Sequence, residues 1–317
     1  MIVSGNTLYG TAASNSESAN GTVFAVKTDG TGFTNLYSFT GGSDGGGPLA
    51  GLVLSGNTLY GTAWGGGTNG SGTVFAVNTD GTGFTTLHSF TETSTNSSGF
   101  YTNSDGANPF AGLILSGNTL YGTAADGGSS GSGTVFKVNT DGTGFTVLHS
   151  FTAWAYEHKN IDGAYPYAGL VLSGNTLYGT AADGGSSGSG TVFAVNTDGT
   201  GFSVLHSFNG GNDGANPNNG LILSGNTLYG TASGGGTNGA GTVFSIFIQP
   251  QLTMIPSSPY VILTWPTNYS GFTLQSTTNF GSSAVWSTNF SPPVVIGGQN
   301  VVINTMSGRQ QFYRLSQ

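Results

Sequence analysis

The chain has 317 residues with a formal net charge of −8, and only 6% of its residues are charged. An acidic chain repels phosphate backbones and anionic lipid headgroups, so nucleic acids and anionic membranes are poor partners for it. The sequence contains no cysteine, which excludes disulfides, thiolate metal sites and cysteine nucleophiles. None of its apolar runs approaches the ~20 residues that are needed to span a bilayer.

One sequence, Gly-Asn-Thr-Leu-Tyr-Gly-Thr-Ala, organises the chain. Each copy is followed by a glycine-rich run and then by Gly-Thr-Val-Phe, and the copies start at Gly5, Gly56, Gly117, Gly174 and Gly225. A spacing of about 50 to 60 residues is more typical of a propeller blade than of a solenoid coil. Residues 1–4 occupy the place that residues 52–55 have in the second repeat, so we expect a leader or further sequence upstream of Met1.

The second repeat shows the first two expected strands. Residues 51–54 form a short apolar run, which is typical of a strand covered on both faces. Residues 56–57 are Gly-Asn and suit a two-residue hairpin turn, because both residues tolerate positive φ. Residues 58–63 then form the second strand, and its alternation places Leu59 and Tyr60 on opposite faces.

The same repeat predicts two further strands, at residues 72–77 and 84–90, joined by a tight turn at Asp80-Gly81. Four antiparallel strands in each of five repeats predict an all-β, five-bladed β-propeller. In such a blade the turns after strands one and three share one face of the disc, and the loops after strands two and four share the other. Two of the latter loops are enlarged, at 91–104 and 152–161, and long loops on a rigid scaffold usually carry binding.

The repeat sequence resembles the GloVer tandem-repeat family of bacterial exported proteins over residues 1–247. This resemblance implies an exported protein at the cell surface, and it supplies no catalytic or ligand-binding residues. Residues 250–317 differ in composition and contain short β-type runs, with Trp265 and Trp286 available for a core. We therefore predict a propeller domain at 1–249 and a small β-sandwich, similar to fibronectin type III domains, at 250–317.

The fifth repeat is incomplete, because no Asp-Gly turn and no fourth strand follow Ile246. An open sheet edge invites pairing with another strand. Residues 252–255 could complete the fifth blade within the chain. Alternatively, a strand from another copy could complete it, which would give strand exchange or head-to-tail assembly.

Two sets of aspartates recur with the repeat. We interpret the first set as turn formers: Asp29, Asp80, Asp141 and Asp198. The second set precedes a proline in Asp-Gly-x-x-Pro and consists of Asp44, Asp105, Asp162 and Asp213. Either each of these caps its own loop, or together they bind Ca²⁺, although each loop offers one carboxylate where that ion takes about six to eight oxygens. We expect no other cofactor.

Three histidines recur at one position of the fourth strand, where the first repeat has Tyr37: His88, His149 and His206. A catalytic or metal-binding histidine would not be copied once in each blade and exchanged for tyrosine. We therefore interpret these three residues as packing or hydrogen-bonding positions.

Aromatic residues in the enlarged connections break the repeat. The candidate ligand-binding residues on this face are Trp64, Phe100, Tyr101, Trp154, Tyr156 and His158. Flat rings beside Asn, Ser and Thr suit the stacking of sugars, but the same rings could equally pack on one another to hold the long loops down. Glu92 and Glu157 lie in the same connections and would fit a glycosidase only at the separation that paired carboxyl groups require.

From these features we expect a non-enzymatic structural or adhesion protein, extracellular or at the cell surface. Its expected partners are other copies of itself or extracellular polysaccharide. A surface rich in Gly, Asn, Ser and Thr supports this function, because it offers many hydrogen bonds and little charge repulsion between copies. A carbohydrate-binding propeller that uses the enlarged loops is the alternative, and a glycoside hydrolase is a third possibility.

Overall fold

The computed structural model describes residues 1–13, 20–154, 159–250, 252–267, 271–279, 284–288, 290–305 and 310–316. Every regular element in these ranges is a β-strand, and they contain no helix long and apolar enough to cross a membrane. The chain divides into two compact units. The first comprises 1–172, 176–222 and 229–244, and the second comprises 173–175, 223–228 and 245–317.

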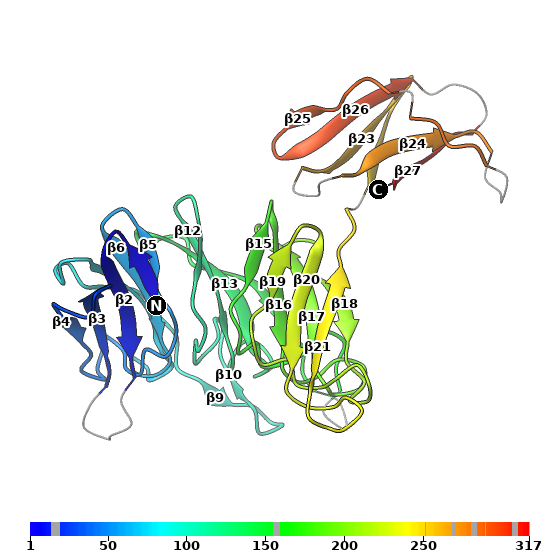
Figure 1. Ribbon diagram of the computed structural model, residues 1–317. Helices are drawn as coiled ribbons and strands as arrows, with labels where there is room; N and C mark the ends of the chain where they lie inside the picture. Colours follow the sequence, from blue (N-terminus) through cyan, green and yellow to red (C-terminus); the bar gives the residue numbers. More distant parts are fainter. Residues whose placement is uncertain are drawn as a thin grey trace. The chain divides into compact units, whose positions relative to one another are not determined.

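The first four repeats each form a four-stranded antiparallel sheet whose strands follow chain order (Figure 1). The first sheet contains β1 (Ile2–Ser4), β2 (Thr7–Ala12), β3 (Thr22–Lys27) and β4 (Thr34–Ser38). The second contains β5 (Val53–Ser55), β6 (Thr58–Ala63), β7 (Thr73–Asn78) and β8 (Thr85–Ser89). The third contains β11 (Ile114–Ser116), β12 (Thr119–Ala124), β13 (Thr134–Asn139) and β14 (Thr146–Ser150). The fourth contains β15 (Val171–Ser173), β16 (Thr176–Ala181), β17 (Thr191–Asn196) and β18 (Ser203–Ser207). The all-β class and the four-stranded antiparallel repeat are thus confirmed.

The predicted turns lie where the sequence places them. In the second sheet Ser55 pairs with Thr58 across the Gly-Asn turn, and Gly56 has a φ of +56°, which glycine adopts without strain. The backbone N–H of Thr79 donates to the carbonyl of Asn57 at 2.8 Å, so the turns after strands one and three lie side by side. Asp80 Oδ1 accepts a bond of 2.9 Å from the N–H of Thr82, which confirms its role as a turn former.

The two faces of each sheet pack against different neighbours, as the alternation predicts. Leu59 belongs to a buried cluster with Val23 of the first sheet, whereas Tyr60 belongs to a cluster with Phe136 of the third. Gly61 is needed between them, because a Cβ there would lie 2.7 Å from the Phe75 ring. A third cluster joins the third and fourth sheets in the same way. The core of this unit is therefore a series of equivalent interfaces between sheets.

The fifth sheet has three strands, β19 (Ile222–Ser224), β20 (Thr227–Ala232) and β21 (Thr242–Phe247). The prediction that residues 252–255 complete it is wrong. These residues lead into β22 (Thr253–Ser257), which instead forms an antiparallel hairpin with β23 (Tyr260–Pro266). Only Ser258 and Pro259 connect β22 to β23, so this hairpin closes at little entropic cost. Closure of the repeats into a five-bladed ring stays a prediction.

The second unit contains two antiparallel sheets, in the orders β22-β23-β26-β25 and β24-β27. The remaining strands are β24 (Thr273–Thr277), β25 (Val294–Ile296), β26 (Gln299–Thr305) and β27 (Phe312–Ser316). Trp265 is 3% exposed and shares one core with Leu274 of the other sheet, as expected of a sandwich. Trp286 is only half-buried, and the Arg314 guanidinium lies 4.1 Å from its ring centre.

Candidate functional site

The loops after strands two and four join neighbouring sheets at one end of the array. Each connection between sheets forms a β-bridge with the glycine-rich loop of the sheet that follows it, as Ala107 does with Asp126 and Ala164 with Asp183. The residue before the recurring proline of each connection donates a hydrogen bond to the glycine-rich loop of the preceding sheet. The N–H of Tyr165, for example, donates to the carbonyl of Ser132 at 3.0 Å. The loop face is therefore a continuous, backbone-bonded surface.

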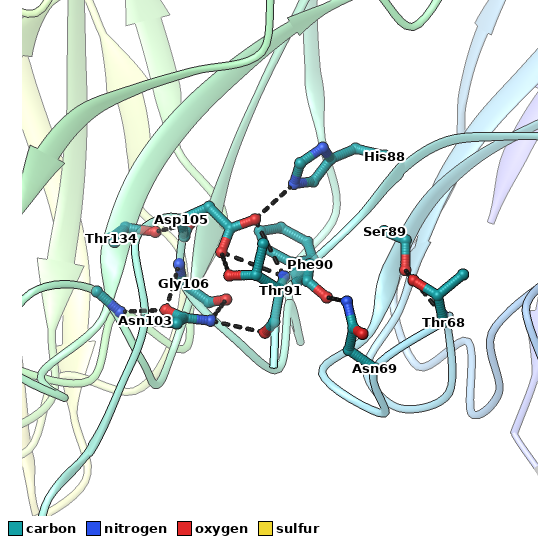
Figure 2. A network of polar contacts seen from close by, with 11 residues as sticks. Thr68, Asn69, His88, Ser89, Phe90, Thr91, Asn103, Asp105, Gly106 and Thr134 are labelled. Atoms are coloured by element: carbon teal, nitrogen blue, oxygen red, sulfur yellow. Dashed lines mark hydrogen bonds and ion pairs between the residues drawn. The ribbon is translucent and has the colours of Figure 1, made fainter. Parts of the chain in front are cut away.

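Asp105 holds the first enlarged connection in place, as Figure 2 shows. Its carboxylate accepts bonds from the backbone N–H and the hydroxyl of Thr91, and one oxygen lies 2.9 Å from Nε2 of His88. Asn103 spans the same loop, since its amide donates to the carbonyls of Thr91 at 2.9 Å and Gly106 at 2.7 Å. The carboxylate therefore caps its own loop.

The other three aspartates of this set make matching contacts. Asp162 bonds Thr152 and His149, Asp213 bonds Asn209 and His206, and Asp44 bonds Thr40 and Tyr37. Burial alone would raise the pKa of Asp105, but the bonds from His88 and Thr91 hold it below its usual value. No three His, Asp or Glu side chains of the described ranges converge as metal ligands. The geometry thus matches loop capping, and it lends no support to the Ca²⁺ prediction.

The recurring histidines pack as the sequence predicts. The ring of His88 stacks on Phe145 of the next sheet at 3.6 Å and 7°, and His149 stacks on Phe202 at 3.5 Å and 8°. Tyr37 takes the same place in the first sheet, where burial and the bond to Asp44 raise its pKa to about 12.

Six aromatic side chains form a continuous row across the loops of the second, third and fourth sheets. We call this set the aromatic row, and its members in contact order are Trp64, Phe110, Tyr167, Tyr165, Trp154 and Phe100. Successive ring centres lie 5.7, 5.6, 6.0, 5.1 and 6.1 Å apart along it. Trp64 is 42% and Tyr167 39% exposed, while the other four side chains are half-buried. The row thus combines mutual packing with two rings open to solvent.

The structure sorts the predicted site residues into three groups. Trp64, Phe100 and Trp154 belong to the aromatic row. Tyr101 lies in β10 (Tyr101–Thr102), which pairs with β9 (Ser94–Thr95), and its side chain is 66% exposed outside the row. Tyr156 and His158, together with Glu157, lie outside the described residues, and Glu92 is exposed.

Sequence reasoning missed Phe110, Tyr165 and Tyr167. Phe110 and Tyr167 follow the proline of their connections, at a position that is Leu49 in the first connection and Asn218 in the fourth. That variation within an otherwise regular segment was a usable signal.

Tyr165 occupies a backbone position that tyrosine rarely adopts. Its φ is +56°, and the residues at the same place in the neighbouring connections are Asn108 and Asn216, with φ of +55° each. Asparagine tolerates this left-handed region, whereas a bulky residue there is strained by the order of 1 kcal/mol. Residues in strained backbone conformations are enriched at functional sites, which makes Tyr165 a candidate site residue.

Two carboxylates stand beside the tyrosines of the row. The charges of Asp126 and Asp183 both act on Tyr165 and Tyr167, whose pKa values are raised first by burial and then by these neighbours. Asn216 donates to Asp183 at 2.8 Å. At the equivalent interface Tyr165 replaces that asparagine and has no amide to donate, and burial raises the pKa of Asp126. Asp126 therefore offers acceptor oxygens beside exposed rings.

A comparison with known protein families identifies the repeat. The model of the Gloeobacter/Verrucomicrobia repeat matches residues 1–157 and 94–258. The chain belongs to this family. No curated protein matches the sequence significantly. In the Gloeobacter/Verrucomicrobia repeats of this chain, the sheet interfaces are nearly invariant, whereas the aromatic row arises where the repeats differ.

Three solved structures illustrate distant likenesses of the fold. A putative 6-phosphogluconolactonase from Bacteroides uniformis is 15% identical with a TM-score of 0.46, over 89% of this chain and 82% of that one. A chain of a nidogen/laminin complex is 14% identical with a TM-score of 0.44, over 82% and 84%. TolB from Acinetobacter baumannii is 11% identical with a TM-score of 0.42, over 83% and 61%. Likenesses at this level carry no argument about function.

Proposed function

We propose that this chain is a non-enzymatic extracellular adhesion protein that binds polysaccharide through the aromatic row. The observation that carries the proposal is the unbroken series of ring contacts from Trp64 to Phe100, with Trp64 and Tyr167 open to solvent. Contiguous apolar surface on a soluble protein is characteristic of an interaction site. Three sheets contribute to the row, so it would contact several units of a chain-like ligand.

The chemistry of the row suits sugars better than other ligands. Aromatic rings pack against the C–H faces of sugar rings, while polar groups beside them bond the hydroxyls and set orientation. Asp126 would accept hydrogen bonds from such hydroxyls, because no described side chain donates to its carboxylate. The tyrosine hydroxyls of Tyr165 and Tyr167 would add donors. The carboxylates of Asp126 and Asp183 beside the row would repel an anionic polysaccharide, which favours a neutral one.

Binding without catalysis is supported by the state of the two carboxylates. Glycoside hydrolysis uses one carboxyl group as acid and another as base or nucleophile. Asp183 is already engaged by Asn216, and Glu92 lies exposed in a connection and outside the row. We therefore assign Asp126 the role of a hydrogen-bond acceptor. The resemblance of the repeats to those of exported bacterial proteins supports the extracellular location that we propose.

The test is affinity electrophoresis of the full chain in gels containing xylan, β-glucan, mannan or dextran. Tyr167→Ala should lower the affinity for the polysaccharide that binds by about tenfold, since an aromatic contact contributes about 1.5 kcal/mol at most beyond its buried area. Trp64→Ala should have a similar effect. Both side chains are substantially exposed, so neither change should affect folding.

Leu49→Ala is the matched control, because Leu49 occupies the position of Tyr167 in the first connection and is 54% exposed. It should bind like the unmodified protein. Unchanged affinity in both Tyr167→Ala and Trp64→Ala would overturn the proposal, and so would an unmodified protein that binds none of the four polysaccharides.

A further inference from the structure

The interfaces between successive sheets are all built from the same two surfaces. One surface carries the tyrosine of strand two and the valine of strand three, and we call it the tyrosine face. The other carries the leucine of strand two and the phenylalanine of strand three, and we call it the phenylalanine face. The tyrosine face of each sheet packs on the phenylalanine face of the next, as Val74 does with Phe136 and Val135 with Phe193.

The tyrosine face of the fifth sheet is uncovered. Val243 is 81% exposed, whereas its equivalents Val23, Val74, Val135 and Val192 are all 0% exposed. Tyr229 of the same face is 44% exposed, against 7% for Tyr60. Ile222, beside it on β19, is 68% exposed. This surface therefore corresponds to one half of a buried sheet interface, but it is exposed to solvent.

The phenylalanine face of the first sheet is uncovered in the complementary way. Leu8 and Phe24 are half-buried, whereas the equivalent Leu59 and Phe75 are 0% exposed. Phe33 is 66% exposed. The equivalent residues are Phe84, Phe145 and Phe202. Each of these rings stacks on a tyrosine or histidine ring of the preceding sheet, with ring centres 3.5 to 3.6 Å apart.

We propose that the first sheet of one copy of this chain docks on the fifth sheet of a second copy, in the arrangement of the internal sheet interfaces. The two uncovered surfaces are the two halves of an interface that recurs along the chain, so each is complementary to the other and not to itself. A contact of this kind is heterologous and generates open chains of copies. The residues named on the two faces are uncharged, so their contact requires no desolvation of a charged side chain.

The contact is smaller than an internal one. Among the described residues the fifth sheet has no fourth strand, so Phe33 of the docked copy finds no histidine or tyrosine ring of such a strand to stack on. Association should therefore be reversible and dependent on concentration, since buried area must first offset the lost freedom of the partners.

The experiment is sedimentation velocity of the full chain from about 1 μM to about 1 mM, a range that covers weak association. The unmodified protein should form species at multiples of 31.9 kDa that grow with concentration. Val243→Glu and Phe24→Glu each place a carboxylate on one of the two faces, at an exposed and a half-buried position, so both should fold and each alone should remain monomeric. An equimolar mixture of the two variants should form dimers and nothing larger. The intact tyrosine face of one variant can dock on the intact phenylalanine face of the other, and the two remaining faces are both altered.

Val285→Glu is the control, since Val285 is 82% exposed in the second unit, and it should associate like the unmodified protein. Three results would overturn the proposal. The unmodified protein could stay monomeric at the highest concentration, which would also be the outcome if the faces met within one chain. The two variants could associate as strongly as the unmodified protein. Their mixture could remain monomeric.

Discussion

The sheet interfaces and the aromatic row are both made of aromatic residues, yet they obey opposite rules. At the interfaces the repeats agree, and Phe75, Phe136 and Phe193 are each 0% exposed at one equivalent position. Along the row the repeats disagree, because the position of Tyr167 is leucine in one connection and asparagine in another. Aromatic residues that are copied form the sheet interfaces, and those that are not copied form the row through which we propose that the protein binds polysaccharide.

The largest effect is expected from the interfaces. Phe193→Ala removes a fully buried ring between the third and fourth sheets, and such truncations cost about 3 to 5 kcal/mol. Urea unfolding followed by circular dichroism measures the loss. Tyr167→Ala provides the contrast, since it should change the free energy of unfolding by less than about 0.5 kcal/mol. Equal losses in the two variants would erase the distinction between the two regions.

The loop caps should show the next largest effect. Asp105→Ala leaves the N–H and hydroxyl of Thr91 and the ring of His88 without their shared acceptor, and we expect a loss of about 2 to 3 kcal/mol. Asp80→Ala is the matched control in an exposed turn and should have a much smaller effect. If Asp105→Ala were as stable as Asp80→Ala, the carboxylate would not be what holds the connection.

Acid should destabilise the protein through the same caps. The pKa values of Asp44 and Asp105 are lower in the folded protein than in the unfolded chain, where they are close to 3.8. Their stabilising contribution is therefore complete above that value and is lost as the pH falls through the lower, folded values. Urea midpoints measured between about pH 7 and about pH 2 should fall at the acid end. In Asp105→Asn this fall should be smaller, and an unchanged acid profile would contradict the assignment.

The sequence predicted the interfaces well because each is a local pattern repeated many times. Period-two alternation placed Leu59 and Tyr60 on opposite faces, and Gly-Asn and Asp-Gly turns fixed the hairpins. The completion of the fifth sheet by residues 252–255 was predicted wrongly, because β22 pairs with β23 across a connection of two residues and not with β21.

The candidate site was only partly predictable. Trp64, Phe100 and Trp154 stood out because they interrupt the repeat. Phe110 and Tyr167 lie at the ends of the two enlarged connections, in segments that follow the repeat, and their contact with one another depends on how sheets are placed side by side. The backbone angle at Tyr165 has a signal in the sequence, since the equivalent residues are Gly47, Asn108 and Asn216, which all tolerate positive φ.

The most direct test of the central claim is Asp126→Asn, with melting temperature and polysaccharide affinity measured on the same preparation. Ionised Asp126 is penalised by burial, which raises its pKa, so replacing it by a neutral amide should raise the melting temperature by a few degrees. The same change should lower affinity several-fold, because a hydroxyl acceptor is weakened. Asp141→Asn, a change in an exposed turn, should lower neither the affinity nor the melting temperature. A variant of Asp126 that is more stable and binds as well as the unmodified protein would contradict the account.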